Sequence, residues 1–510
     1  MNKFYITTTL PYVNSDPHLG FALEMVQTDA IVRYQKLIGK EVFFNTGTDE
    51  HGLKIYRKAK EEGKEINQYV GEYAEKFKQL MPALGISSDI HFIRTTDEKH
   101  VRACKEFWNR CYNNGDIYKK IYHVKYCVGC ELEKTESELN EQGRCLIHPN
   151  LELEQIEEEN YFFRFSRYQK PLLEYYEKNT DFVVPDFRFN EIKEFVKRGL
   201  QDFSVSRLKD KMPWGVEVPG DETHVMYVWF DALINYVSTL GWPKFGGGNL
   251  EVRDEKKQAG SPISNLQSLF SKFWGTKEYP NAIQIAGKDN LRQQSAMWQA
   301  MLMSAGLPNS RQIIIHGFIT SGGQKMSKSL GNVADPYEII SRLQSKGLTN
   351  EQAVDALRYY LLREVPTFED GDYTWEHFIE TYNANLANGL GNLVSRALKM
   401  AANAGIKHKE SGVEYENGRF LEKYELQKAM DEIWQKISAC DEYIQKTEPF
   451  KTVKTDKAKA EKDIKHLLSE LNQVALNLQP FLPKTAEKIL QVLKDPKEEN
   501  IPRLFPRIDS

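Results

Sequence analysis

The stretch that decides the fold lies at the start of the chain, where FYIT at residues 4–7 and EVFF at residues 41–44 flank a helical pattern. Both short runs are rich in β-branched and aromatic residues, which is typical of strands. Apolar residues recur at helical spacing from Leu19 to Ala30, and Gly39 ends the pattern. Strand, helix and strand in this order predict a βαβ unit, from which parallel sheets are built.

Polar residues gather where the two predicted strands end. Tyr12 and His18 follow the first strand, and TDEH at residues 48–51 follows the second. Asp16 is the expected cap of the intervening helix, with Pro17 in its first turn. Because ligands bind at the carboxyl ends of parallel strands, we expect the functional site in this region.

The predicted sheet continues much later in the chain. Apolar, β-branched runs follow at residues 225–230, 282–286 and 313–317. Residues 115–160 contain paired cysteines and indicate an insertion, whereas long helical patterns run from about residue 376 to about residue 493. The expected fold class is therefore α/β, a doubly wound parallel sheet of Rossmann type with an insertion, followed by an α-helical bundle.

Five segments follow from these patterns. The expected boundaries are 1–115 for the first half of the sheet domain, 116–224 for the insertion, 225–335 for the second half, 336–375 for a linking region and 376–510 for the helical domain. Breaks near residues 410–412 and 448–449 divide the helical domain, and we expect no further domain after it.

Composition limits the classes of protein that fit. With 510 residues, 41% hydrophobic content and 27% charged content, the chain has the make-up of a folded protein with several domains. A net charge of -4 gives no indication of a nucleic-acid partner. Since no apolar run reaches the ~18 residues of a spanning helix and the start lacks a signal-peptide pattern, we expect a cytoplasmic protein without membrane contact.

Three of the six cysteines cluster in the predicted insertion. CVGC at residues 127–130 and CLIH at residues 145–148 offer Cys127, Cys130, Cys145 and His148. Three thiolates and one imidazole complete a tetrahedral zinc site without an open position for water, so the pattern predicts one structural Zn²⁺. The alternative is that these four residues are unrelated to a metal.

Two further motifs offer groups that bind phosphate. GGQKMSKS at residues 322–329 combines two glycines, which free the backbone, with two lysines that can reach one polyphosphate. A solvated basic turn explains this motif equally well. PHLG at residues 17–20 opens the first predicted helix, whose amino terminus attracts anions, although a single histidine there is also common on protein surfaces.

Together, the HLG and KMSKS motifs resemble the signature pair of the class I aminoacyl-tRNA synthetases. Within this class the chain is similar to the methionyl-tRNA synthetase family along nearly its whole length. The additional matching segments are TLPYVN at residues 9–14, GTDEHG at 47–52, WGVEVPGD at 214–221, VWFDALINY at 228–236 and LGNLVSR at 390–396. The two-knuckle zinc insertion is also a feature of that family.

The resemblance implies a methionine–tRNA ligase that uses ATP and Mg²⁺. Such an enzyme converts methionine and ATP to methionyl-adenylate and pyrophosphate, then transfers methionine to the 3′ end of tRNA(Met) and releases AMP. Carried over to this chain, His18 and Lys328 would stabilise charge on the phosphates, with Lys325 assisting. Gly20 and Ser327 would complete the ATP site.

The resemblance also implies a methionine pocket and an anticodon site. The pocket residues would be Leu10, Tyr12, Asp49, Trp229, Ala232, Tyr236 and Trp298. Asp49 would take the ammonium group, and the aromatic rings would enclose the thioether, although plain core packing also explains the two tryptophans. The anticodon would be read by Asn392, Arg396 and Phe450. Lysines between residues 451 and 459 suit a phosphate backbone and a solvated helix face equally well.

The chain departs from the family pattern at four positions. Phe21 replaces the second histidine of the first motif, and Phe450 replaces a tryptophan at the stacking position. Asn290 and Gln294 stand where the family tends to have an apolar residue and a histidine. These changes predict one polar contact fewer to ATP and a different wall of the methionine pocket.

Three other functions compete with that of a monomeric methionine–tRNA ligase. A cysteine-specific synthetase would place zinc beside its substrate, whereas all four expected ligands here lie within one insertion. A leucine-specific synthetase would need a much larger editing insertion. A catalytically silent paralogue that binds tRNA is favoured only by Phe21, while His18, Asp49, Lys325 and Lys328 oppose it.

Overall fold

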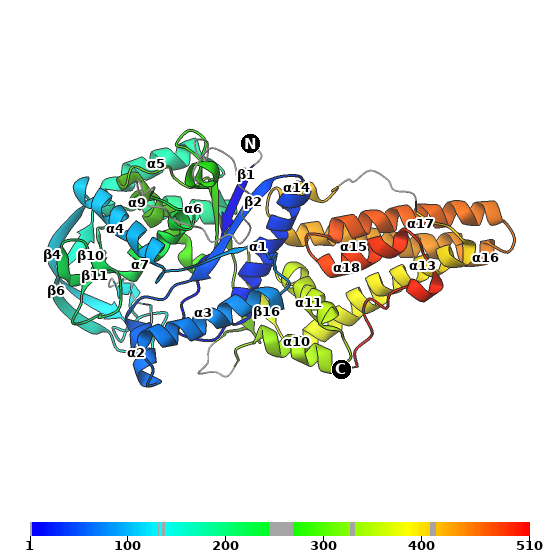
Figure 1. Cartoon of the computed structure of the whole chain (residues 1–510), viewed down its shortest axis with the longest axis horizontal. Coiled ribbons are helices and arrows are strands. Elements are labelled where there is room, and N and C mark those ends of the chain that lie inside the picture. The colour runs from blue at the N-terminus through cyan, green and yellow to red at the C-terminus, as the bar shows by residue number, and fades with distance from the viewer. Residues whose placement is uncertain are drawn as a thin grey trace, which may run out of the picture. The chain divides into compact units, whose positions relative to one another are not determined.

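The computed structural model describes residues 3–130, 132–134, 138–243, 269–326, 332–408 and 415–509. The chain divides into two compact units. The first unit comprises residues 1–16, 42–78 and 89–315, and the second comprises residues 17–41, 79–88 and 316–510 (Figure 1). Among the described helices, none combines the length and the apolar character that crossing a bilayer requires.

A six-stranded sheet forms the centre of the first unit. Its order is β3 (His91–Arg94), β2 (Glu41–Thr48), β1 (Lys3–Thr7), β12 (Ala282–Gly287), β13 (Gln312–His316) and β7 (Val183–Val184). The pairs β1–β12, β2–β3 and β13–β7 are parallel, with Tyr5 opposite Ala282 and Asn45 opposite His91. Every residue of β12 is buried, as expected for an inner parallel strand. The predicted parallel sheet is confirmed.

Helix α1 (Leu19–Leu37) joins the neighbouring strands β1 and β2 in the chain, as the βαβ prediction requires. The predicted cap, however, is wrong. His18 is extended, and its own Nδ1 accepts a hydrogen bond from the Gly20 N–H at 3.1 Å. Asp16 and Pro17 both precede this N-cap, so Pro17 does not lie in the first turn as expected, and Asp16 forms an ion pair with Lys76 Nζ at 2.6 Å.

The expected strand at residues 225–230 is also wrong. Strand β11 (Asp221–Met226) ends there and pairs antiparallel with β9 (Ser206–Leu208) and β10 (Glu217–Val218) in a separate sheet. The remaining residues begin helix α7 (Val228–Leu233), which α8 (Asn235–Ser238) follows. A short buried apolar run has no periodicity that separates a strand from a buried helix, which explains the error.

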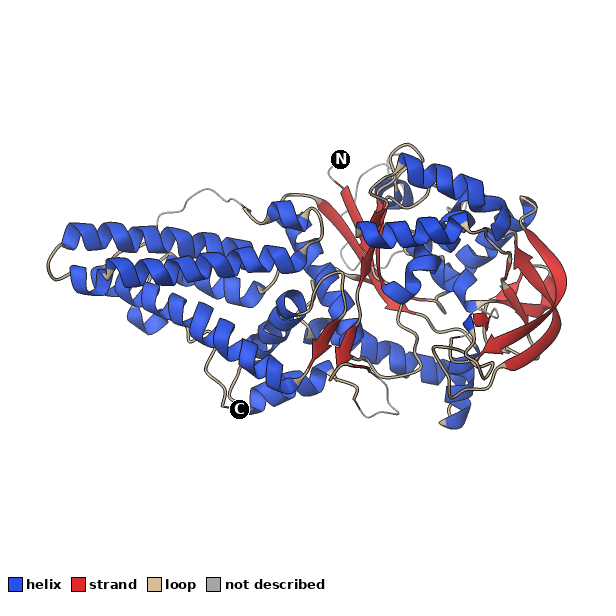
Figure 2. Cartoon of the chain, turned by 180° about the vertical axis from the view of Figure 1, so that it is seen from behind, coloured by secondary structure: helices blue, strands red, loops and turns tan. Residues whose placement is uncertain are grey.

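The insertion is built on a long antiparallel hairpin. Strands β4 (Ile117–Cys127) and β6 (Glu154–Phe163) pair along their length, flanked by β5 (Leu132–Lys134) and β8 (Phe203–Ser204). Figure 2 shows these strands in red as one curved sheet. The remaining described α-helices between residues 42 and 315 are α2 (Leu53–Glu61), α3 (Ile66–Ala83), α4 (Glu98–Asn113), α5 (Gln169–Lys178), α6 (Asp186–Lys197) and α9 (Trp298–Ser304).

A small sheet in the second unit carries the described start of the GGQKMSKS motif, residues 322–325. Strand β14 (Ile319–Ser321) pairs with β15 (Gln324–Lys325) and with β16 (Gly371–Tyr373). The run predicted at residues 313–317 forms β13, which ends at His316, and residues 322–325 of the motif lie in this separate hairpin. Helices α10 (Pro336–Ser345) and α11 (Asn350–Tyr359) follow.

The rest of the second unit is helical, as predicted. Its helices are α12 (Trp375–Thr381), α13 (Asn392–Ala404), α14 (Gly418–Leu421), α15 (Leu426–Thr447), α16 (Pro449–Thr452), α17 (Lys457–Leu478) and α18 (Pro483–Leu493). In Figures 1 and 2, α13, α15, α17 and α18 lie side by side as a bundle. The predicted break at residues 448–449 is confirmed, because Glu448 has a φ of 42° and ends α15. The predicted break at 410–412 lies outside the described residues.

Candidate functional site

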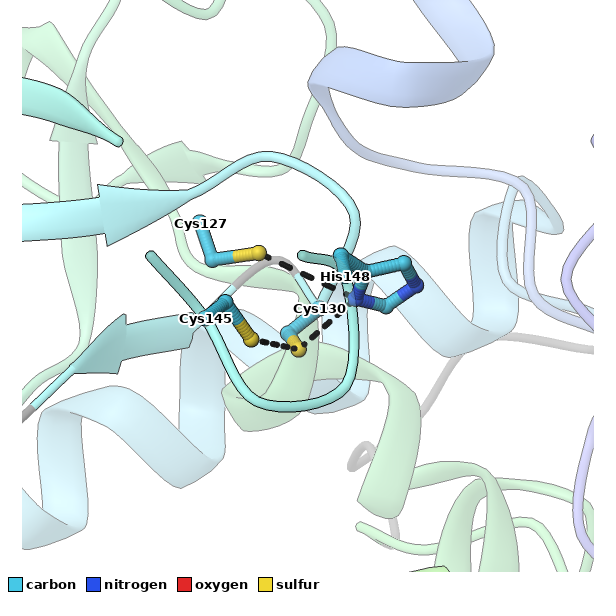
Figure 3. A group of neighbouring side chains, drawn as sticks. All are labelled: Cys127, Cys130, Cys145 and His148. Carbon is cyan, nitrogen blue, oxygen red and sulfur yellow. Dashed lines mark hydrogen bonds between the residues drawn. The ribbon is translucent and has the colours of Figure 1, made fainter. Parts of the chain in front are cut away.

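The four predicted metal ligands converge in the insertion. Cys130 Sγ lies 3.2 Å from His148 Nδ1 and 3.5 Å from Cys145 Sγ, and Cys127 Sγ lies 3.8 Å from His148 Nδ1. All four donor atoms lie within 4.8 Å of one another and point inward (Figure 3). The cysteines are not joined by disulfides. This donor set and spacing fit a closed tetrahedral zinc site.

The backbone of the first knuckle is shaped for this cluster. A Cβ atom at Gly129 would lie 2.7 Å from the His148 ring, so only glycine lets the two knuckles approach. Burial raises the pKa of the Cys145 thiol, but hydrogen bonds from the backbone N–H groups of His148 and Ile147 outweigh it and leave this pKa below its ordinary value. The thiolate, which is the form that binds metal, is therefore favoured at Cys145.

In the first unit, the ends of β1 and β2 bring Tyr12 and Asp49 together. The two residues form a parallel bridge, in which the Asp49 N–H donates to the Pro11 carbonyl at 2.9 Å and the Val13 N–H donates to the Asp49 carbonyl at 3.1 Å. The Asp49 side chain is buried, and Leu10 is half-buried. A carboxylate thus lies beside a tyrosine at the predicted edge of the sheet.

The neighbour of Asp49 in sequence fixes this strand end. Glu50 is fully buried, and its carboxylate accepts two hydrogen bonds from Arg94, at 2.7 and 2.9 Å. Thr48 and Thr96 donate to the same carboxylate at 2.7 and 2.6 Å. Sequence reasoning did not identify this contact, because Arg94 has no pattern that separates it from a surface arginine.

Tyr236 and Trp298 meet within the first unit. Their rings lie edge to face with centroids 5.8 Å apart, and the Trp298 ring also stacks on Phe107 at 5.7 Å. Gln294, which stands at the family's histidine position, donates from Nε2 to Tyr236 Oη at 2.7 Å. Asn290 is half-buried and donates to Asp289 at 3.2 Å. Gln294 is therefore joined to the aromatic pair of Tyr236 and Trp298 by a hydrogen bond.

Helix α7 carries Trp229 and Ala232, and a buried polar pair ties it to the strand end that carries Asp49. Asp231 Oδ2 lies 3.0 Å from His51 Nδ1, and both side chains are buried. Burial raises the pKa of the Asp231 carboxyl above its ordinary value, although His51 opposes this shift. Because His51 follows Asp49 by two residues, the pair holds α7 against the strand end that carries Asp49.

In the second unit, the HLG motif forms the start of α1. His18 is half-buried and caps the helix through Nδ1, so in this arrangement its Nε2 carries the remaining proton. Phe21, the departure from the family pattern, is buried within the first turn of α1. The structure places Lys325 at the end of β15, whereas Ser327 and Lys328 lie outside the described residues.

The predicted anticodon residues lie on two helices of the second unit. Asn392 is exposed at the start of α13, and Arg396 follows one turn later. Arg396 forms an ion pair with Asp441 on α15 at 2.9 Å. Phe450 lies on α16, and 47% of it is exposed, which is unusual for an aromatic residue. An exposed ring at a helix corner is available for stacking.

Comparison with known proteins defines the class. The family profile described as "tRNA synthetases class I (M)" matches residues 4–146 and 132–398, and the profile described as "Anticodon binding domain of methionyl tRNA ligase" matches residues 403–505. The chain therefore has the domains of a class I tRNA synthetase, followed by a methionyl-type anticodon domain.

Relatives narrow this class to one family. A methionine–tRNA ligase of Thermotoga maritima is 38% identical over 96% of this chain and 75% of its own length. A methionine–tRNA ligase of Brucella suis is 38% identical over 98% of this chain and 93% of its own. Mycobacterium tuberculosis methionyl-tRNA synthetase in complex with methionyl-adenylate superimposes with a TM-score of 0.82, at 34% identity over 96% of this chain and 94% of that one. The chain belongs to the methionine–tRNA ligase family.

Proposed function

We propose that this chain activates methionine with ATP and transfers it to tRNA(Met). The reaction forms methionyl-adenylate and pyrophosphate first, and the terminal ribose hydroxyl of the tRNA then displaces AMP. The observation that carries the proposal is the pairing of Tyr12 with the buried Asp49 at the ends of β1 and β2, within a chain of this family. The relatives support this ligase activity and do not support a silent paralogue.

The methionine site is proposed to be Leu10, Tyr12, Asp49, Trp229, Ala232, Tyr236 and Trp298. Asp49 binds the ammonium group by a charge-assisted hydrogen bond, which leaves the methionine carboxylate free to attack the α-phosphate of ATP. The edge-to-face pair Tyr236 and Trp298 offers ring surface to the polarisable thioether. A carboxylate nucleophile needs no general base, so these residues act by positioning.

ATP is proposed to bind at His18, Gly20, Lys325, Ser327 and Lys328, with Mg²⁺ expected to accompany the phosphates. The solved relative with methionyl-adenylate supports ATP as the activating substrate. The amino terminus of α1 attracts anions, and His18 lies there as the N-cap, where its Nε2–H would donate to a phosphate oxygen. Both lysines would neutralise the charge that develops as pyrophosphate leaves.

The zinc cluster and the helical domain complete the proposal. Cys127, Cys130, Cys145 and His148 would hold one structural Zn²⁺, which would stabilise the knuckles without taking part in the chemistry. Asn392, Arg396 and Phe450 would read the anticodon, and a stacked base needs the exposed ring that Phe450 offers. A monomeric state and a cytoplasmic location stay predictions of the sequence.

Exchange of labelled pyrophosphate into ATP tests the activation step. Methionine should support exchange, whereas cysteine and leucine should not. Asp49→Asn is expected to raise the KM for methionine strongly at an unchanged KM for ATP, because the amide lacks the charge that binds ammonium. Absence of exchange with every amino acid would refute the proposed activity.

A further inference from the structure

A buried pair that neither the motifs nor the family match assigns lies at the end of β13. His316 Nε2 lies 2.9 Å from Glu24 Oε2, and His316 Nδ1 lies 2.7 Å from the Gly317 carbonyl. Both side chains are 6% exposed. A carbonyl only accepts, so Nδ1 carries a proton, and one further proton lies between Nε2 and the Glu24 carboxyl. Both ring nitrogens are therefore engaged, and the orientation of the imidazole is fixed.

The pair connects α1 to the chain segment that contains the KMSKS motif. We call residues 317–334 the lysine segment, of which 317–326 and 332–334 are described. Glu24 on α1 contacts its start through His316, and the Leu19 N–H donates to the Ala334 carbonyl at its end, at 2.9 Å. The first two turns of α1 thus contact both ends of the lysine segment.

The hairpin within the lysine segment is held closely on its other side. A Cβ atom at Gly317 would lie 2.0 Å from the Glu369 carbonyl oxygen, so the backbone has no room to move there. The Gly371 N–H donates to the Phe318 carbonyl at 2.9 Å, and Asp372 Oδ1 accepts from the Gly323 N–H at 2.9 Å. The strands β14, β15 and β16 are thus joined as one unit, whose placement against α1 depends on contacts such as that of His316 with Glu24.

We propose that His316 is a positioning residue for ATP activation: held by Glu24, its imidazole fixes the hairpin that carries Lys325 against the first turns of α1, where His18 lies. The inference rests on the proposed function, since it assigns His316 an effect through the groups proposed to bind the phosphates. Such groups lose effect steeply when they are displaced, because their benefit depends on preorganised geometry. His316 itself does not contact the phosphates in this assignment.

Two substitutions of His316 distinguish the contribution of its hydrogen bond with Glu24 from that of its hydrogen bond with Gly317. The amide nitrogen of glutamine reaches the position of Nε2, so His316→Gln keeps the donor to Glu24. The shorter His316→Asn keeps a donor near Gly317 and loses the contact with Glu24. A hydrogen bond to a charged group is worth enough to change a rate on the order of 10- to 100-fold. We expect a loss of that size in kcat for pyrophosphate exchange with His316→Asn and retention of most activity with His316→Gln.

The measurement is methionine-dependent exchange with each variant, with the KM for methionine as internal control. An unchanged KM for methionine, a lowered kcat and little further loss when His316→Asn is combined with Lys325→Ala support the proposal. Equal kcat values for the Asn and Gln variants would overturn it, as would a lowered unfolding midpoint without a change in kcat.

A second variant, at Glu24, tests the proposal if His316→Asn does not fold. Glu24→Gln keeps the side-chain volume and replaces the charged contact by a neutral one, so a partial loss in kcat is expected, and an unchanged kcat would overturn the proposal. Failure of the proposed function has a different signature. In that case the unmodified chain is silent with every amino acid, whereas an active chain with unaffected His316 and Glu24 variants refutes the positioning role alone.

Discussion

Replacing Arg358 by methionine should destabilise the second unit by several kilocalories per mole. The Arg358 side chain is fully buried and forms an ion pair with the equally buried Asp29 at 2.9 Å. It also donates to the carbonyls of Phe481, Leu84 and Pro480, at 2.8, 3.2 and 3.3 Å. Arg358→Met therefore leaves a buried carboxylate and three carbonyls without this partner. Since breaking a buried ion pair from one side costs ~3–5 kcal/mol, a unit stable by ~5–15 kcal/mol would lose a large share of its stability.

Arg33 provides the matched control, because it contacts the same carboxylate from a more exposed position. Arg33 Nε lies 2.6 Å from Asp29 Oδ2, but 23% of its side chain is exposed. Arg33→Met should therefore cost much less, ~1 kcal/mol, because water replaces part of the lost contact. Urea unfolding of the full chain, followed by far-ultraviolet circular dichroism, compares the midpoints of the two variants. Equal midpoints for the two variants would show that burial does not determine how much each arginine's contact with Asp29 contributes to stability.

The stability that the Asp29–Arg358 pair contributes changes with pH in the acidic range, and the direction of this change follows from the pKa of Asp29. Burial raises this pKa, but Arg358 and Arg33 outweigh burial and leave it below its ordinary value. A carboxyl with a depressed folded pKa contributes stability that is fully present above its unfolded pKa of ~3.9 and is lost as pH falls through the folded pKa. In Arg358→Met, the free energy of unfolding should therefore fall less steeply as the pH is lowered. A variant whose stability falls as steeply as that of the unmodified chain would contradict the role given to the Asp29–Arg358 pair.

Three further perturbations probe the proposed sites. Gln294→Leu removes the buried donor to Tyr236 Oη, which costs ~1–3 kcal/mol, and should raise the KM for methionine at an unchanged KM for ATP in pyrophosphate exchange; an unchanged KM for methionine would exclude a pocket role. Cys145→Ser should reduce the zinc content from about one ion per chain and lower the unfolding midpoint, and full occupancy by metal analysis would refute the cluster. Phe450→Ala should weaken tRNA charging by a free energy of ~1–3 kcal/mol, the contribution of one stacked base, and leave pyrophosphate exchange unchanged, with Phe450→Trp as the active control. An equal loss in both assays would exclude Phe450 from the anticodon site.

The parallel sheet and the metal cluster could be predicted from sequence because their signals are local. Short β-rich runs locate β1, β12 and β13, and ligand spacing within each knuckle locates the four donors. The errors arose where two local rules compete. At residues 225–230 an apolar run satisfied both strand and buried helix, and at Asp16 a good capping residue lost to His18, whose ring reaches the Gly20 N–H directly.

Pairs between distant segments could not be predicted. Glu24 and His316 are 292 residues apart, and each one taken alone resembles a surface residue of a helix or a strand end. The Arg94 bond to Glu50 and the His51 bond to Asp231 belong to the same kind. Composition hid the nucleic-acid partner for a related reason, since a net charge of -4 averages over the whole chain while recognition of a tRNA needs only a few local readers.

Helix α1 shows that such pairs can be inferred once the buried positions of a helix are known. It is buried along most of its length, yet it carries two carboxylates, Glu24 and Asp29, within its buried positions. A buried carboxylate is costly unless a cation or donor satisfies it, so each one implies a partner brought in from elsewhere in the chain. The partners are His316, next to the lysine segment, and Arg358, next to the turn between α17 and α18. The helix that His18 caps is thereby fixed to the lysine segment and to the helical bundle, so a change in either contact should alter the proposed ATP site before it alters the proposed methionine site.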